Sequence, residues 1–342
     1  YYRAGQTIVL SITESNPNYV TITTIGTTTL TQFSANDFED GEYSITAVDL
    51  AGNTTTKSFI VDKTLPIFSL NAFYNASETV KLAITEVNLN YVTLDGDVIS
   101  NYNVPTSSLD DGTHTIIVYD LAGNERSKTF IVDKTAPVFT LKEFYAANET
   151  ISLVVEEANL DYVTLDGERT EMRLFSVVDL NEGTHTVMVY DKAKNNTKKT
   201  FVVDKTGPAF SVDSFYKAGQ TVSITITETN LDVVTLDGTV QGVAHSWKTD
   251  DLAEGSHTIR ATDKAGNATE HSFIVDKTAP DFSVNAFYNA SETVLIEITE
   301  VNLNYVTLDG DVIINYTIAA VTLSDGAHTV IAYDQAGHNT KK

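Results

Sequence analysis

Carboxylate and amide side chains recur along this chain at an interval of 71 to 72 residues, and such oxygen ligands suit Ca²⁺. One recurring segment is the turn sequence Asp-x-Ala-Gly-Asn, at 49–53, 120–124 and 263–267, with variants at 191–195 and 334–338. Another is Asp-Lys-Thr-x-Pro, at 62–66, 133–137, 204–208 and 276–280. The chemistry to consider first is therefore cation binding by repeated clusters.

Each predicted calcium site takes an Asp from an Asp-Lys-Thr-x-Pro segment, a Glu and an Asn from the next loop, and polar residues of the following turn. The candidate ligands are Asp62, Glu86, Asn88, Asp120 and Asn124; Asp133, Glu157, Asn159, Asp191 and Asn195; Asp204, Glu228, Asn230, Asp263 and Asn267; and Asp276, Glu300, Asn302 and Asp334. Ca²⁺ is the only cofactor that the residues suggest. The alternative stays open that these are plain turns, in which Asp accepts backbone N–H groups and Gly takes a positive φ. Lys194 would also bring a positive charge to its cluster.

Catalytic arrangements are missing from the sequence. There is no Ser-His-Asp order, nucleophile elbow or phosphate loop. The adjacent Glu156 and Glu157 point to opposite faces of a strand and cannot act as an acid/base pair. We therefore expect no enzyme and no catalytic residue.

The overall composition limits the partners. A net charge of −24 repels phosphate backbones and anionic lipids, which argues against nucleic acid and membrane surfaces. No apolar run approaches the roughly 18 residues of a spanning helix, so we expect no membrane insertion in this segment. There is no Cys, which excludes disulfides and thiolate metal sites. Because the first and last repeats are incomplete, we expect a segment of a longer array.

The elements that must position the clusters are short strands. In the second repeat, alternating or apolar stretches predict strands at 66–70, 79–85, 91–94, 98–104, 113–119 and 128–132. No stretch shows helical periodicity. Six or seven strands with turns every 8 to 12 residues predict a Greek-key β-sandwich. In that fold the loops carrying the candidate ligands meet at the pole where the chain enters.

A further motif resembles a known corner. Asp110-x-Gly112-x-His114 is similar to the tyrosine corner of immunoglobulin domains, and the first repeat carries Tyr43 itself. His185, His257 and His328 occupy the same position. The resemblance implies that these histidines are buried and bound to nearby backbone rather than to a metal.

The motifs together resemble the bacterial Ig-like repeats of large cell-surface proteins and adhesins. That resemblance implies an extracellular, surface-displayed stalk or adhesive segment and carries over no catalytic residue. The first repeat departs from the pattern, because it lacks Leu-Asp-Gly and has Pro17 where the others have Leu.

We therefore expect an extended rod of five Ig-like Greek-key β-sandwiches, numbered repeats 1 to 5. Their predicted bounds are 1–63, 64–134, 135–205, 206–277 and 278–342. The leading hypothesis is a structural stalk or fibre that projects a functional domain and contacts only its neighbouring repeats. Two alternatives stay open: an adhesive module for a surface glycan or protein, and an accessory region of a secreted hydrolase. For adhesion the candidate is the loop 239–250, with His245 and Trp247.

Overall fold

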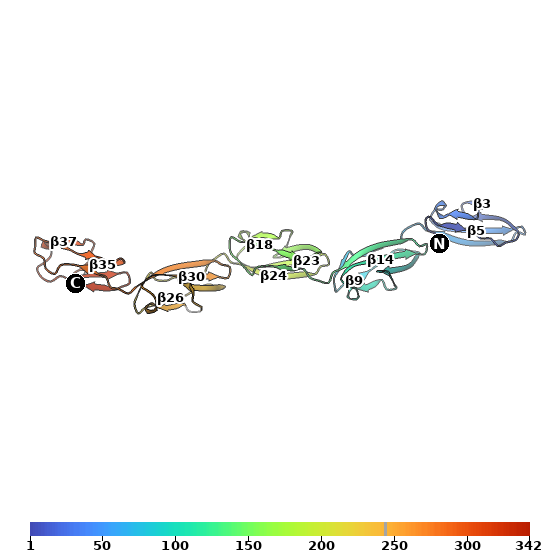
Figure 1. Cartoon of the computed structure of the whole chain (residues 1–342). Coiled ribbons are helices and arrows are strands. Elements are labelled where there is room, and N and C mark those ends of the chain that lie inside the picture. The colour runs from blue at the N-terminus through green and yellow to red at the C-terminus, as the bar shows by residue number, and fades with distance from the viewer. Residues whose placement is uncertain (243–244) are drawn as a thin grey trace. The chain divides into compact units, whose positions relative to one another are not determined.

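The structure is a computed structural model that describes residues 1–242 and 245–342 (Figure 1). It divides into two compact units. Unit 1 comprises Tyr1–Thr140, Val154–Met172 and Thr186–Lys199; unit 2 comprises Leu141–Leu153, Arg173–His185 and Thr200–Lys342. The described residues of both units form strands and single-turn 3-10 helices. The predicted all-β class is confirmed.

Repeat 2, in unit 1, shows the sandwich most clearly. One layer is a five-stranded sheet in the order β12-β11-β14-β15-β8. Its strands are β8 (Phe73–Tyr74), β11 (Leu89–Leu94), β12 (Asp97–Ile99), β14 (Gly112–Asp120) and β15 (Glu125–Val132). The other layer pairs β7 (Phe68–Ser69) with β10 (Ala83–Ile84) and β9 (Thr79–Lys81) with β13 (Asn103–Pro105). This two-layer arrangement is that of an Ig-like β-sandwich.

The core between the layers follows from side-chain alternation. Along β14, His114, Ile116 and Val118 are buried while the residues between them are less so. Ile116 and Val118 pack with Val80 of β9 and Phe130 of β15 in one apolar cluster, and the His114 ring stacks on Phe130. Repeats 1, 2, 4 and 5 each contain an apolar core cluster built from their own residues.

Two strand predictions for repeat 2 were wrong in extent. The stretch 79–85 is divided into β9 and β10, because the first part pairs with β13 and the second with β7. The stretch 98–104 contains the ends of two strands, β12 and β13, which belong to different layers. The dipeptide Phe73-Tyr74, which lies outside the predicted strands, forms β8 and pairs in parallel with the end of β15.

The rest of unit 1 follows the same plan. Repeat 1 has a sheet in the order β3-β2-β5-β6 and the pair β1-β4. Its strands are β1 (Thr7–Val9), β2 (Pro17–Ile22), β3 (Gly26–Thr28), β4 (Gln32–Ser34), β5 (Gly41–Asp49) and β6 (Thr54–Val61). From repeat 3, unit 1 holds β16 (Val138–Thr140), β19 (Val154–Glu156), β20 (Leu160–Leu165) and β21 (Glu168–Thr170).

Unit 2 begins with the other strands of repeat 3 and continues through repeats 4 and 5. From repeat 3 it holds β17 (Phe144–Tyr145), β18 (Thr150–Ser152) and β22 (Leu174–Ser176), while β23 (Gly183–Asp191) and β24 (Asn196–Val203) belong partly to each unit. Repeat 4 has β25 (Phe215–Lys217), β26 (Thr221–Ser223), β27 (Leu231–Leu236), β28 (Thr239–Val240), β29 (Ser246–Lys248), β30 (Gly255–Asp263) and β31 (Ala268–Asp276). Repeat 5 has β32 (Phe282–Ser283), β33 (Thr293–Leu295), β34 (Glu297–Ile298), β35 (Leu303–Leu308), β36 (Asp311–Ile313), β37 (Thr317–Ala319), β38 (Val330–Asp334) and β39 (Asn339–Lys341).

A single 3-10 turn precedes the corner motif in every repeat, and the sequence analysis missed it. These turns are η1 (Ala35–Asp37), η2 (Thr106–Ser108), η3 (Val177–Asp179), η4 (Thr249–Asp251) and η5 (Ala320–Thr322). In η1 the Ser34 side chain accepts the Asn36 N–H and the Asp37 carboxylate accepts the Ser34 N–H. The Ser-x-x-Asp spacing of a capping box was the available signal.

Trp247 lies in a strand, not in a loop as the sequence analysis placed it. It is the central residue of β29, pairs with Val222 of β26 and packs against the core of repeat 4. Its Nε1 donates to Gln241 Oε1 at 2.9 Å. The ring thus has a packing role. Residues 243 and 244 of the proposed adhesive loop lie outside the described residues.

Candidate functional site at the repeat junctions

The turn between β14 and β15 closes on itself through Asp120 and Asn124. The backbone N–H and the Nδ2 of Asn124 donate to the two carboxylate oxygens of Asp120, each at 2.8 Å. Gly123 has φ +86°, in the left-handed region that favours glycine, which explains the Gly of the motif. Asp120 is fully buried, so both its oxygens serve this turn.

The turn also holds the junction segment that enters repeat 2. Asn124 Nδ2 donates its second hydrogen to the backbone carbonyl of Asp62 at 2.8 Å. Asn88 Nδ2 donates to Asp62 Oδ2 at 3.2 Å, while the hydroxyl of Thr64 donates to Asp62 Oδ1 at 2.7 Å. The prediction that these loops meet the incoming Asp-Lys-Thr-x-Pro segment is confirmed.

The bonds from both amides recur at the next junction of unit 1, and the bond to the carboxylate recurs at the last junction of unit 2. Asn159 Nδ2 donates to Asp133 Oδ2 at 2.8 Å, and Asn195 Nδ2 donates to the Asp133 carbonyl at 2.8 Å. Asn302 Nδ2 donates to Asp276 Oδ2 at 2.7 Å. At these junctions the amides therefore present N–H donors to the carboxylates, whereas a calcium ion would need their oxygens.

The predicted glutamate ligands cap their own loops. A carboxylate oxygen of each accepts the backbone N–H two residues further on. The pairs are Glu86 with Asn88 at 2.9 Å, Glu157 with Asn159 at 2.7 Å, Glu228 with Asn230 at 3.1 Å and Glu300 with Asn302 at 3.1 Å. One oxygen of each glutamate is thus already engaged.

The junction at Asp204 in unit 2 is different. Carboxylate oxygens of Asp204, Glu228 and Asp263 lie within 4.8 Å of one another. Asn267 Nδ2 still donates to the Asp204 carbonyl at 2.9 Å, but Asn230 Oδ1 is buried without a hydrogen-bond partner. Three carboxylates and one unpartnered amide oxygen are a donor set that fits Ca²⁺.

A second close group, also in unit 2, joins Asp276, Asp334 and His338. His338 occupies the place of the turn Asn, and its Nδ1 lies 2.9 Å from Asp334 Oδ2. The structure thus gives His338 a partner that the sequence analysis did not find. Elsewhere in the described ranges the predicted calcium ligands do not form a three-member carboxylate or histidine group of this kind.

The turn carboxylate of repeat 3 differs from the one in repeat 1. Burial raises the pKa of Asp191 above its ordinary value, although hydrogen bonds from Asn195 oppose this. In repeat 1 the hydrogen bonds from Asn53 lower the pKa of Asp49, whose carboxylate is more exposed. In repeat 3 the junction segment at Asp133 covers the turn, because Asn195 Nδ2 also donates to the Asp133 carbonyl.

The corner histidines make the predicted backbone bonds. Nε2 of His114 lies 2.9 Å from the Asp110 carbonyl, and Tyr43 donates its hydroxyl to the Glu39 carbonyl at the same distance. His185 and His257 repeat the bond, and all three histidines are buried; His328 also makes it but is half-buried. The histidine thus replaces the tyrosine in the corner.

Two further sets of residues hold the corner and were missed. Asp95, Asp237 and Asp309 of the Leu-Asp-Gly turns each place Oδ2 at 2.5 to 2.6 Å from a corner histidine. The Lys of each Asp-Lys-Thr-x-Pro segment donates Nζ to a carbonyl beside the 3-10 turn, as from Lys63 to Phe38 at 2.6 Å. The constant spacing of both motifs from the corner was the only signal in the sequence.

No protein-family model matches the sequence, and no curated protein is detectably similar to it. Solved structures resemble it in fold. The tetra-tandem repeat in the extending region of a large adhesion protein is 20% identical, covers 79% of this chain and 94% of that chain, and has a TM-score of 0.23. The N-terminal eight Ig domains of Down Syndrome Cell Adhesion Molecule are 14% identical over 100% of this chain and 66% of that chain, with a TM-score of 0.21.

Immunoglobulin domains 1–4 of Sidekick-1 are 10% identical over 81% of this chain and 95% of that chain, with a TM-score of 0.25. At these identities the likeness is one of fold alone, and we draw no functional conclusion from it. Separately, none of the helices in the described residues is long and apolar enough to cross a membrane.

Proposed function

We propose that the chain is an extracellular structural spacer in which residues 1–63, 64–134, 135–205, 206–277 and 278–342 fold as five sandwiches. In this role the chain projects another functional domain from a cell surface. The observation that carries the proposal is that the polar residues of the junctions and corners bind other groups of the protein itself. The junction Asn side chains donate to backbone carbonyls and carboxylates of the junction Asp residues, and the corner histidines bond to backbone carbonyls.

The bonds at each junction support a spacer because they tie the incoming segment to the repeat that follows. Asn124 binds the carbonyl of Asp62, and Asn195 does the same for Asp133. A connector that hydrogen bonds and Pro hold in one conformation keeps the domains at its two ends at a fixed separation, which a flexible linker does not. A spacer also does not require any one repeat to carry a binding site that the others lack.

Removal of one internal repeat tests the spacer function. Deleting residues 135–205 should shorten the maximum dimension measured by small-angle scattering by about 35–40 Å, the length expected for strands at a rise of about 3.3 Å plus their loops. The other repeats should keep their hydrogen-exchange protection. An unchanged dimension would show that the repeats fold back on one another, and the spacer function would then be abandoned.

We further propose that Ca²⁺ binds at the junction of Asp204, Glu228 and Asp263, with Asn230 Oδ1 as a fourth ligand. The proximity of the three carboxylates and the unpartnered oxygen support this site. At the other predicted sites Asn88, Asn159 and Asn302 hold the junction carboxylates through N–H donors, so a cation is not needed there. A bound ion would join repeats 3 and 4 at the one junction that contains Gly207.

A further inference from the structure

An arginine covers a stacked pair of tyrosine rings on the outer sheet face of repeat 3. Tyr162 of β20 and Tyr190 of β23 lie opposite each other, and their ring centroids are 4.6 Å apart with the rings 18° from parallel. Both rings face away from the core, because Tyr162 alternates with the buried Val163. The Arg169 guanidinium of β21 lies 4.3 Å from the centroid of the Tyr162 ring, a cation–π contact. Its Nη2 is 3.7 Å from Asp161 Oδ1.

The two partners of Tyr162 lie on opposite sides of its ring. In the sheet β20 lies between β21 and β23, so Arg169 approaches the ring from one side and Tyr190 from the other. All of these residues belong to unit 1. A tyrosine pair on this sheet face therefore holds a guanidinium on the side of its edge strand.

Repeats 2 and 5 contain a pair of rings with the same geometry. In repeat 2, Tyr91 of β11 and Tyr119 of β14 stack with centroids 4.5 Å apart and rings 21° from parallel. In repeat 5, Tyr305 of β35 and Tyr333 of β38 stack at 4.6 Å and 21°. The first pair lies within unit 1 and the second within unit 2.

Valine takes the place of Arg169 beside these two pairs. The register of β12 against β11 and of β36 against β35 places Val98 and Val312 where β21 has Arg169. The two valines are 69% and 63% exposed. The tyrosines of β11 and β35 are each 38% exposed, whereas Tyr162 beside its arginine is half-buried. One ring of each pair is therefore open to a cation from outside the repeat.

Negative charge at the open pair of repeat 2 favours a cationic occupant over a neutral one. Glu125 of β15 lies opposite Tyr119. Burial and the hydrogen bond with Glu125 raise the pKa of the Tyr119 phenol, so the ring stays neutral beside a carboxylate. The net charge of −24 also attracts cations to the chain as a whole.

Hydrogen-bond acceptors lie beside the open rings. Asn90 in repeat 2 and Asn304 in repeat 5 occupy the sequence position of Asp161, and both are exposed. An amide oxygen accepts guanidinium N–H groups as a carboxylate does. In repeat 2, Thr93 lies opposite Val98, and among the described residues its buried Oγ1 has no hydrogen-bond partner. The site thus offers acceptors as well as a ring face.

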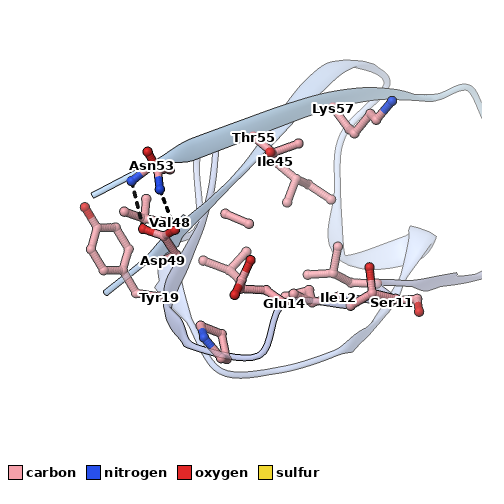
Figure 2. Close-up of a pocket in the computed structure, with 15 residues that line it drawn as sticks. Ser11, Ile12, Glu14, Tyr19, Ile45, Val48, Asp49, Asn53, Thr55 and Lys57 are labelled. Atoms are coloured by element: carbon pink, nitrogen blue, oxygen red, sulfur yellow. Dashed lines mark hydrogen bonds between the residues drawn. The ribbon is translucent and has the colours of Figure 1, made fainter. Parts of the chain in front are cut away.

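Other residues occupy the pair positions in repeats 1 and 4. In repeat 4, Val233 lies opposite Thr262. In repeat 1, Tyr19 lies opposite Val48, so a single ring stands at this place (Figure 2). Repeat 4 therefore provides a control within the chain that has the same sheet without the rings.

We infer that the outer sheet faces of repeats 2 and 5 are docking sites for arginine side chains of a partner polypeptide. In repeat 2 the guanidinium lies over Tyr91 and donates to Asn90, while its methylene groups pack on Val98. Repeat 5 uses the corresponding residues. Arginine is preferred to lysine because its planar, weakly hydrated guanidinium stacks on aromatic rings. A basic partner is thereby held along the side of the chain, a role beyond that of a spacer.

The peptide Gly-Arg-Gly-Arg-Gly, with blocked ends, tests the sites on the intact chain. NMR spectra of isotope-labelled tyrosine rings should show saturable shifts for the pairs of repeats 2 and 5 and none for the pair of repeat 3. The matched peptide Gly-Lys-Gly-Lys-Gly has the same charge. It should bind about two- to fivefold more weakly, the effect of one exposed cation–π contact.

Two substitutions locate the sites. Val98→Arg supplies a guanidinium from the chain itself, so it should remove the shift of Tyr91 and leave that of Tyr305. Arg169→Ala uncovers Tyr162, which should then shift on addition of the peptide. Both positions lie on the exposed sheet surface. Unchanged hydrogen exchange of the core strands confirms that the two variants fold.

The inference fails on any of the following results. They are no saturable ring shift up to about 50 mM peptide, equal binding of the arginine and lysine peptides, an unchanged Tyr91 shift in Val98→Arg, and no new Tyr162 shift in Arg169→Ala. Shifts of the same rings with a neutral oligosaccharide but not with the arginine peptide would overturn it as well, and would identify a carbohydrate as the occupant.

Discussion

Asp95 and His114 lie 2.6 Å apart, from Oδ2 to Nδ1, and link the hairpin turn of repeat 2 to its corner. The other oxygen of Asp95 accepts the backbone N–H of Thr115 at 2.8 Å. In repeat 1, where Tyr43 holds the corner, the place of Asp95 is taken by Thr23, whose hydroxyl lies 2.7 Å from that of Ser44. The aspartate therefore accompanies the histidine and is absent beside the tyrosine.

Removing the imidazole should destabilise repeat 2. The variant His114→Ala leaves the Asp110 carbonyl unpaired and opens a void beside Phe130, on which the imidazole stacks. We expect the free energy of unfolding of this repeat to fall by about 1–3 kcal/mol. Amide exchange of the core residues of repeat 2 measures the change separately from the other repeats. The variant His114→Tyr should lose less stability than His114→Ala. An equal loss would show that tyrosine cannot replace the histidine at this corner.

The histidine corners should make repeats 2 and 5 less stable at higher pH. Burial alone would lower the pKa of His114, but the hydrogen bonds to Asp95 and to the Asp110 carbonyl raise it. The bond to Asp309 raises the pKa of His328. This stabilisation is fully present below the unfolded pKa of about 6.5 and is lost as pH rises through the higher folded value.

Proton NMR titration of the two imidazoles measures the folded pKa values directly. Exchange protection followed from pH 5.5 to 8.5 should decline in repeats 2 and 5. Repeat 1 provides the control, because Tyr43 is at its corner and should give no such decline in this range. Titration of His114 below the ordinary histidine value would contradict the assignment.

The bond from Asn124 to the Asp62 carbonyl should hold the first junction. Asn124→Ala removes this bond and the bond to Asp120, whereas Asn53→Ala removes only the equivalent of the second. The difference between the two variants isolates the junction bond, which should contribute about 1 kcal/mol. Faster proteolysis after Lys63 in Asn124→Ala, but not in Asn53→Ala, is the measurement. Equal cleavage rates would mean that Pro66 and packing alone hold the junction.

Lys194 should be a source of strain in repeat 3. It has φ +71° at the position where repeats 2 and 4 have Gly123 and Gly266. A side chain in this region costs about 1 kcal/mol, so Lys194→Gly should raise the stability of repeat 3 by that amount. The reverse change, Gly123→Lys, should lower that of repeat 2. Denaturation followed by repeat-specific amide exchange gives both values, and a destabilising Lys194→Gly would show that the lysine makes a compensating contact.

The Asp204 junction should bind Ca²⁺ and the Asp133 junction should not. Calorimetric titration should give one site, and ion binding should raise the melting temperature because it favours the folded state. Glu228→Gln should weaken binding, whereas Glu157→Gln, at the equivalent position of repeat 3, should have no effect. Binding that both variants leave intact would place the ion elsewhere, and the absence of any Ca²⁺-dependent shift would reject the site.

The strand pattern could be predicted, because it follows from the alternation of apolar and polar residues. The meeting of the loops at the junctions could also be predicted, because their turn residues have a fixed geometry. The orientation of the amides could not. An Asn side chain offers both an oxygen and two N–H groups, and only the surrounding atoms decide which faces a carboxylate. Asn88 and Asn230 share the sequence pattern Glu-x-Asn-Leu, yet one donates to Asp62 and the other has a buried, unpartnered oxygen.

The sequence also did not allow us to predict that Asp95 is the partner of the corner histidine His114. Asp95 has φ +51° and is explained by its turn alone. Its contact with His114 depends on the register of β11 and β14, in which Leu94 lies opposite Ile116. A register of this kind is set by the whole sheet and by the bulge between Leu89 and Tyr91, which no local motif specifies.

The parallel pairing of β8 with the end of β15 decides how a repeat resists tension. The N–H groups of Ile131 and Asp133 donate to the carbonyls of Ala72 and Tyr74, each at 2.9 Å. A force that pulls the two ends of the repeat apart loads these bonds along the strand direction, so they must break together. The β14–β15 hairpin, by contrast, can open one pair at a time. The Phe-Tyr dipeptide thus places a shear-loaded latch where the chain enters and leaves repeat 2, and the parallel pairs β17–β24 and β25–β31 repeat it.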